Sequence, residues 1–508
     1  MVKTTDPRAG WLGRLEAAGD ALPDPAALFL GFFGLVVALS AGLAPMDFGL
    51  LDPRNGEALR VVDLTAGPAA AKFIADATTT FTGFRPLGLV IVVMLGVGVA
   101  DRAGLIHAAL RGILRGVPVW ALSPAVLFAG ILSHVAGDAG FVLVVPVAGR
   151  LFRAAGRHPV AGIAAAFAGV SGGFSASLLP SALDPLLAGI TAQAGRIVAP
   201  ALEVNPMCNL WFTMSASVLV VGLGWLLTDR WVEPGLSALV VDGAPPDGSA
   251  HVLPNEGRGL GAAAAVFVGL AVGLVALAGP AASALRDPSG SLWGPQAPLM
   301  ASLVPLITLG FFGPGLAFGI VTGRIRSHRD VVDGMRRGVE GLSGYLVMAF
   351  FAAQFVEAFS RSNLGALVSV EGASALAAAR VPVPVTLVGL VFLSAGVDLL
   401  IGSASAKWAM MGPVLVPMLM QVGVSPELTQ AAYRVGDSTA NIVTPLMPYF
   451  PLVLGYARAH ASSVGTGTLI GRMIPYSLVY LVAWTAWLLA FWGLGWPLGL
   501  GGGLTWPR

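Results

Sequence analysis

The chain consists of long apolar runs separated by short polar connections. A helix needs about 20 consecutive apolar residues to cross the hydrocarbon core of a bilayer. Such a helix satisfies its backbone hydrogen bonds internally, so the pattern predicts a polytopic membrane protein built of helices. We expect spanning helices at approximately Pro25–Leu43, Pro86–Ala100, Val117–Leu132, Phe141–Phe152, Leu210–Leu227, Leu260–Leu277, Pro298–Val321, Gly341–Phe359, Ile442–Tyr456 and Ile474–Leu494.

Two apolar stretches are interrupted by Gly, Ser and Pro. The first, about 161–200, contains GIAAAFAGVSGGFSASLLPSALDPLLAGIT, and the second, about 381–424, contains LSAGVDLLIGSASAKWAMMGPVLVPMLM. Irregular backbone survives at membrane depth only inside protein or beside a water-filled cavity, and paired broken segments indicate a transporter's binding site. We predict two re-entrant helical hairpins in an internal, inverted repeat; two ordinary kinked helices are the alternative.

Polar segments divide the chain into two halves. The insertions at 233–258 and 286–293 are rich in Pro, Gly, Asp and Ser and read as extramembrane loops, and a third polar insertion covers 47–85. The N-terminus fits either a surface helix or an unstructured start. The expected regions are a cytoplasmic N-terminal segment (1–22), a first transmembrane repeat (23–230), an extramembrane linker (231–258), a second repeat (259–498) and a C-terminal tail (499–508).

Composition supports a lipid environment. Of the 508 residues, 56% are hydrophobic and 11% are charged, whereas soluble proteins have about 25% charged residues. The net charge of +2 carries no nucleic-acid signature, and the single Cys208 excludes an internal disulfide. Basic clusters at 102–115 and 324–337 should lie inside, with the N-terminus. The helices predicted above would place these two clusters on opposite sides, so at least one segment must be broken, re-entrant or merged with a neighbour.

Ionisable residues within apolar segments are costly and are the first functional candidates. Arg434 and Asp437 lie three residues apart and share a helix face. Arg434 offers a fork of donors to a substrate carboxylate or sulfonyl group, and Asp437 could bind a coupling cation or a proton. A self-neutralising pair is the alternative. The other intramembrane candidates are Asp138, beside His134, and Asp184, Asp398 and Lys407.

The second broken stretch carries groups suited to a cation and an aromatic ligand. Ser403 and Ser405 supply the hard oxygen ligands that Na⁺ prefers, and Asp398 adds an anionic one. Trp408 offers a flat apolar wall for an aromatic substrate, with a packing role as the alternative. In the first stretch, Asp184 follows a Gly/Ser tip, where a capping or loop role is the alternative.

These residues lie in blocks that resemble the p-aminobenzoyl-glutamate transporter (AbgT) family. The blocks SASAKWAMMGP and AAYRVGDSTANIVTPLMPYF are the most specific. SHVAGDAGFVLVVPVAGRLF, GRHPVAGIAAAFAGVSGGFSAS, DPLLAGIT and NPMCNLWF match the same family in the first half. The resemblance implies a homodimer in the bacterial inner membrane, with about nine spanning helices and two re-entrant hairpins per protomer, similar to the ion transporter superfamily.

The resemblance also implies a function and a site. It implies gradient-driven transport of p-aminobenzoyl-glutamate or export of sulfonamide antimetabolites, without a cofactor other than a bound Na⁺. The family's cation site involves the start of the second hairpin and the Asp of YRVGD. Asp398 stands where the family's pattern has Asn, and we expect it to be a coupling-ion residue. The substrate-site positions implied are Asp184, Ser405, Trp408, Pro426, Arg434 and Asp437, and the coupling-ion positions are Asp184, Asp398, Ser403 and Asp437.

Other functions are less well supported by the sequence. No GxxxxGK[ST] phosphate loop is present, so a proton or Na⁺ gradient would supply the energy, and no HExxH motif indicates a metalloprotease. We therefore expect a transporter and not an enzyme. The alternative is an ion-coupled di- or tricarboxylate carrier on a related hairpin fold.

Overall fold

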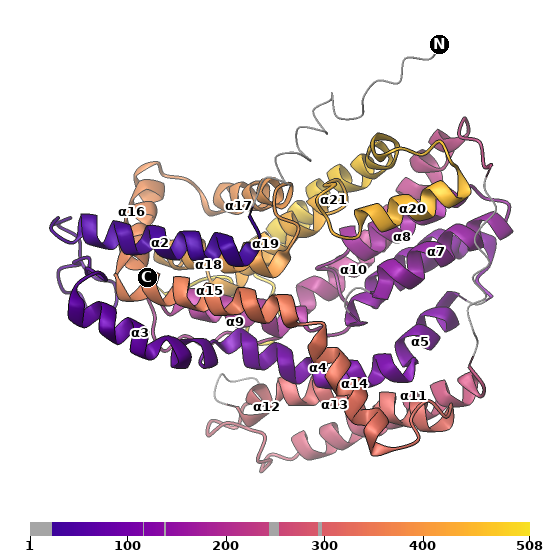
Figure 1. Cartoon of the computed structure of the whole chain (residues 1–508), viewed down its shortest axis with the longest axis horizontal. Coiled ribbons are helices and arrows are strands. Elements are labelled where there is room, and N and C mark those ends of the chain that lie inside the picture. The colour runs from indigo at the N-terminus through magenta and orange to yellow at the C-terminus, as the bar shows by residue number, and fades with distance from the viewer. Residues whose placement is uncertain (1–22, 115, 137–138, 243–252, 293–296, 508) are drawn as a thin grey trace.

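Every regular element in the described part of the chain is a helix. The structure is a computed structural model that describes residues 23–507, except 115, 137–138, 243–252 and 293–296 (Figure 1). The predictions for the segment 1–22 and for Asp138 lie outside these residues. The all-α fold class predicted from the apolar runs is confirmed.

The first half of the chain runs to the polar linker. Several of its helices carry a Pro in their first two positions, as at Pro25, whose preceding Asp24 accepts a hydrogen bond from the Ala26 amide. Its helices are α2 (Pro25–Leu43), α3 (Gly67–Thr82), α4 (Arg85–Ala103), α5 (Leu105–Leu114), α6 (Leu122–Leu132), α7 (Ala139–Ala154), α8 (Pro159–Phe167) with the π-turn η4 (Ala168–Gly172), α9 (Leu183–Gly195) and α10 (Leu210–Leu227) with the π-turn η5 (Thr228–Val232).

The second half contains the longest helix of the described chain. Across the two halves, seven described segments are long and apolar enough to span a membrane, so the multi-pass prediction is confirmed. The helices of this half are α11 (Glu256–Ala278), α12 (Pro298–Ala301), α13 (Leu303–Val321), α14 (His328–Glu340), α15 (Ser343–Arg361), α16 (Leu364–Ala378), α17 (Val383–Asp398), α18 (Ala404–Gln421), α19 (Pro426–Ala440), α20 (Phe450–His460) and α21 (Thr466–Leu494).

One predicted span is wrong. Residues 442–456 do not form a continuous helix, because α19 ends at Ala440 and α20 begins only at Phe450. Pro445 and Pro448 lie between them, and proline both lacks an amide donor and disfavours helical backbone at the preceding residue. The polar insertion 47–85 also contains a helix, α3, with no buried residue.

Both predicted breaks are present. In each broken stretch, the two arms, which are the helices before and after the break, pack mainly against other helices and not against each other. α8 packs against α6, α7 and α20, whereas α9 packs against α4, α18 and α19, so the two arms lie in different parts of the molecule (Figure 1). In the second stretch α17 packs chiefly on α19, and α18 packs on α9 and α16. The breaks therefore bring arms from the two halves of the chain together.

α4 approaches its neighbours very closely. It packs against α13 and α14. A Cβ atom on Gly96 would lie 2.3 Å from the Thr308 carbonyl oxygen, and one on Gly98 would lie 2.4 Å from that of Gly334. Small residues permit such backbone contact between membrane helices, where van der Waals packing is the main attraction.

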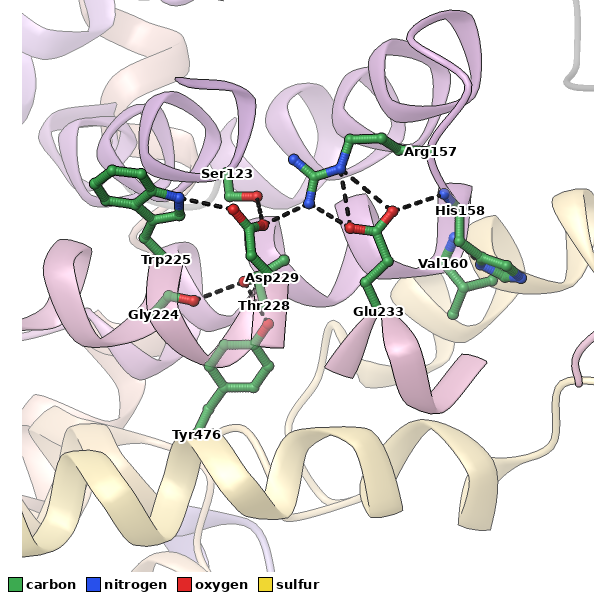
Figure 2. Close-up of polar contacts among 10 residues, drawn as sticks. All are labelled: Ser123, Arg157, His158, Val160, Gly224, Trp225, Thr228, Asp229, Glu233 and Tyr476. Carbon is green, nitrogen blue, oxygen red and sulfur yellow. Dashed lines mark hydrogen bonds and ion pairs between the residues drawn. The ribbon is translucent and has the colours of Figure 1, made fainter. Parts of the chain in front are cut away.

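A polar network joins α8 to η5 (Figure 2). Arg157, which precedes α8, contacts Asp229 at 2.5 Å and also binds Glu233. The Ser123 hydroxyl and the Trp225 indole donate to the Asp229 carboxylate at 2.6 and 2.7 Å. The arginine pairs with both acids, so these three charged side chains have a formal net charge of −1.

Candidate functional site

Four helix interruptions border one cavity of about 420 Å³. They lie between α8 and α9, α14 and α15, α17 and α18, and α19 and α20. Phe174 lines the cavity at the first interruption, Leu342 at the second, Ser403 at the third and Asn441 and Tyr449 at the fourth. This volume lies within the range of small-molecule sites, about 300–1,000 Å³. The cavity is therefore built by unwound backbone from both halves.

Arg434 forms a buried ion pair with Asp184. Its Nη2 donates to Asp184 Oδ1 at 2.8 Å, and the Ser181 amide donates to Asp184 Oδ2 at 2.8 Å. Arg434 is 1% exposed. Its Nε has no hydrogen-bond partner among the described residues. Because a guanidinium has five N–H donors, the pair leaves donor capacity for a further oxygen ligand.

Lys407 lies between two other carboxylates. Its ammonium contacts Asp398, the last residue of α17, and Asp437 of α19, the latter at 2.6 Å. The Tyr433 hydroxyl lies 2.6 Å from the Ala404 carbonyl and 3.1 Å from Asp437 Oδ1. The three charged side chains are at most 1% exposed. The interrupted end of α17 is thereby joined to α18 and α19.

An aromatic pair and a chain of hydrogen bonds lie beside these charges. The Trp408 and Tyr433 rings stack with centroids 4.5 Å apart. Trp408 Nε1 donates to the Thr191 hydroxyl at 2.8 Å, and Gln430 Nε2 donates to the same oxygen at 2.7 Å. Asn209 Nδ2 donates to Gln430 Oε1 at 2.5 Å. These bonds hold Trp408 in one orientation, because its indole can only donate.

The remaining predicted positions are more dispersed. Ser403 and Ser405 both line the cavity, with their hydroxyls 3.4 Å apart, and Ser403 caps α18. Pro426 is buried at the first position of α19. It precedes Arg434 by eight residues, which is about 12 Å along a helix. The structure thus brings together Asp184 with Arg434 and Asp398 with Asp437, and it places Pro426 apart from them.

Sequence reasoning missed several members of this site. Lys407 stood out as an intramembrane charge, but no pattern paired it with acids nine residues before and thirty residues after it. Tyr433 lies four residues before Asp437, a helical spacing that could have indicated contact. Thr191 and Gln430 carried no signal beyond being polar in apolar surroundings.

A bundle of membrane-length apolar helices that is interrupted around a cavity and holds buried ion pairs defines a membrane transport protein. The family model for the AbgT putative transporter family matches residues 10–506. The chain therefore belongs to this family, as its motifs predict, and is a multi-pass protein of the bacterial inner membrane.

Relatives and solved structures agree with this assignment. The chain is 33% identical to the p-aminobenzoyl-glutamate transport protein of Escherichia coli (strain K12), over 97% of this chain and 96% of that protein. The crystal structure of the Alcanivorax borkumensis YdaH transporter, described as having an unusual topology, superposes with a TM-score of 0.88 at 42% identity and covers 94% of this chain and 100% of its own. Neisseria gonorrhoeae MtrF, described within a class of antimetabolite efflux pumps, has a TM-score of 0.90 at 39% identity and covers 98% and 100%.

Proposed function

We propose that this protein is a secondary active transporter of p-aminobenzoyl-glutamate or of sulfonamide-type antimetabolites, driven by a proton or sodium gradient. The observation that carries the proposal is the buried Arg434, with an Nε donor that no described residue accepts. Both substrate classes present oxygen acceptors, a glutamate carboxylate or a sulfonyl group. A planar guanidinium suits both groups better than an ammonium does.

The surroundings of Arg434 support an aromatic substrate. The stacked pair of Trp408 and Tyr433 lies on the neighbouring turns of α18 and α19. Ser405, one turn before Trp408, lines the cavity, as does Leu183, which precedes Asp184 in the chain. Aromatic rings favour offset stacking with one another. An aryl group in the cavity would therefore contact Ser405, one turn from Trp408, and Leu183, the neighbour of the Asp184 that pairs with Arg434. We also infer that the protein acts as a homodimer.

Uptake into proteoliposomes tests this function. Radiolabelled p-aminobenzoyl-glutamate would be offered under imposed proton and sodium gradients separately, with a sulfonamide as competitor. Removing one partner of a buried charge pair costs about 2–5 kcal/mol, so we expect Arg434→Ala to reduce flux by more than about tenfold. Arg434→Lys keeps the charge but lacks the fork, and we expect it to restore only part of the flux.

The matched control is Arg336→Ala, because Arg336 is 71% exposed and does not line the cavity. Its flux should equal that of the wild type. Gradient-driven flux that Arg434→Ala retains in full would contradict the assignment of Arg434. Flux of di- or tricarboxylates but not of the aryl-glutamate would favour the carboxylate carrier instead.

A further inference from the structure

The buried carboxylates Asp398 and Asp437 share a cation that belongs to the protein. Both contact the ammonium group of Lys407, and all three side chains are almost fully excluded from solvent. They come from three different helices, α17, α18 and α19. Two uncompensated carboxylates at this depth would be strongly unfavourable, so a cation between them stabilises the fold.

The same position has the chemistry of a monovalent metal site. Hard cations take carboxylate, hydroxyl and carbonyl oxygens as ligands. Two carboxylates meet here, and the Tyr433 hydroxyl and the Ala404 carbonyl lie beside them. A Na⁺ ion and the Lys407 ammonium carry the same charge and would compete for the same oxygens.

We propose that Lys407 is a tethered cation that occupies this site, so that the transporter neither binds nor needs Na⁺ at Asp398 and Asp437. The inference rests on the proposed ion-coupled transport and narrows its coupling ion. It also assigns Asp398 a different role from that expected at the sequence level: its carboxylate balances Lys407 instead of binding a metal ion. The ion that remains to drive transport is the proton.

The charges around Lys407 are consistent with proton coupling. Asp184 on α9 is paired with Arg434 on α19, which leaves Lys407 alone to balance Asp398 and Asp437. One carboxylate of these two therefore exceeds the available positive charge and can hold a proton.

The other helices packed on α18 direct their acids elsewhere. Glu371 on α16 is exposed, and Glu357 on α15 pairs with Arg361. Neither acid forms an ion pair with the Lys407 ammonium, so the charge balance at this site is set by residues of α9, α17, α18 and α19.

Thermal unfolding of the purified protein in detergent tests the inference without requiring transport. The Tm would be measured in NaCl, KCl and choline chloride at equal ionic strength. Ligands that bind the native state raise the Tm in a saturable manner. We expect the same Tm for the wild type in all three salts. Lys407→Gln vacates the position between the carboxylates, and we expect its Tm to rise with Na⁺ but not with choline.

Two further variants sharpen the experiment. Lys72→Gln is the matched control, because Lys72 is an exposed lysine on α3, and it should behave as the wild type. Asp398→Asn combined with Lys407→Gln removes one charge of each sign, so it provides a folded protein for the test even if Lys407→Gln alone fails to fold. We expect it to bind Na⁺ through Asp437.

A Na⁺-specific rise in the Tm of the wild type would overturn the inference, as would folded variants that do not respond to Na⁺. The outcome is separable from the proposed function. If the variants gain Na⁺ binding but the wild type carries no aryl-glutamate under any gradient, the substrate assignment fails and the tethered cation stands. Flux of the aryl-glutamate that needs Na⁺ in the wild type would support the substrate assignment and overturn the tethered cation.

Discussion

At the scale of single residues, one hydroxyl holds much of the site's geometry. The Thr191 oxygen accepts hydrogen bonds from both Trp408 and Gln430. All three side chains are buried. We expect Thr191→Val, which keeps the shape and removes the acceptor, to destabilise the protein by about 1–3 kcal/mol, because two buried donors lose their partner. Thermal unfolding would measure this cost.

The control for that change is Thr82→Val, at the exposed C-terminal end of α3. Its unfolding should be almost unchanged. A Thr191→Val protein as stable as the Thr82→Val protein would show that the shared hydrogen bond contributes little. Combining Thr191→Val with Trp408→Phe should cost less than the sum of the two changes, since both remove the same bond.

At the scale of elements, the close approach of α4 to α13 and α14 depends on glycine. Gly98→Ala would place a methyl group 2.4 Å from the Gly334 carbonyl oxygen. We expect a loss of about 1–3 kcal/mol from overpacking. Gly88→Ala, on the same helix with nothing within 4 Å of the new methyl group, should be neutral or slightly stabilising. Comparing the two melting temperatures separates packing from helix propensity, and equal values would contradict the packing argument.

At the scale of the whole molecule, the loop after α2 connects the two halves. Arg54 binds Asp52 and donates to Asn363 Oδ1 at 2.6 Å, just before α16. The Val62 amide donates to the Ser362 carbonyl at 3.0 Å. This loop therefore ties the beginning of the chain to a helix three hundred residues later.

The charge in this loop predicts a dependence of stability on pH. The bond from Arg54 holds the pKa of Asp52 below its ordinary value of 3.8. The stability contributed by the Arg54–Asp52 pair is complete above the pKa of Asp52 in the unfolded chain. It is lost as the pH falls through the lower pKa of Asp52 in the folded chain. We expect the Tm to fall in acid less steeply for Arg54→Gln than for the wild type. Parallel Tm–pH curves would contradict this role.

The sequence by itself determined the class of protein, most of its helices and its family. Long apolar runs can satisfy their backbone groups in lipid only as helices, so composition was sufficient to predict them. Gly, Ser and Pro marked the breaks at 161–200 and 381–424 because these residues are poor in helix interiors. Arg434, Asp437 and Asp184 were visible because a charge in an apolar segment is costly and therefore rare. In each case the signal is local.

The tertiary structure alone decided which of these residues meet. Asp184 and Arg434 lie 250 residues apart in the chain, and Lys407 joins Asp398 to Asp437 across a helix break. It also decided that the arms of each broken stretch pack on other helices, and that the chain between Ala440 and Phe450 lines a cavity instead of spanning the membrane. Such pairings follow from the shapes of packed helices and from the need to balance buried charge. Neither is encoded in the spacing of residues along one segment.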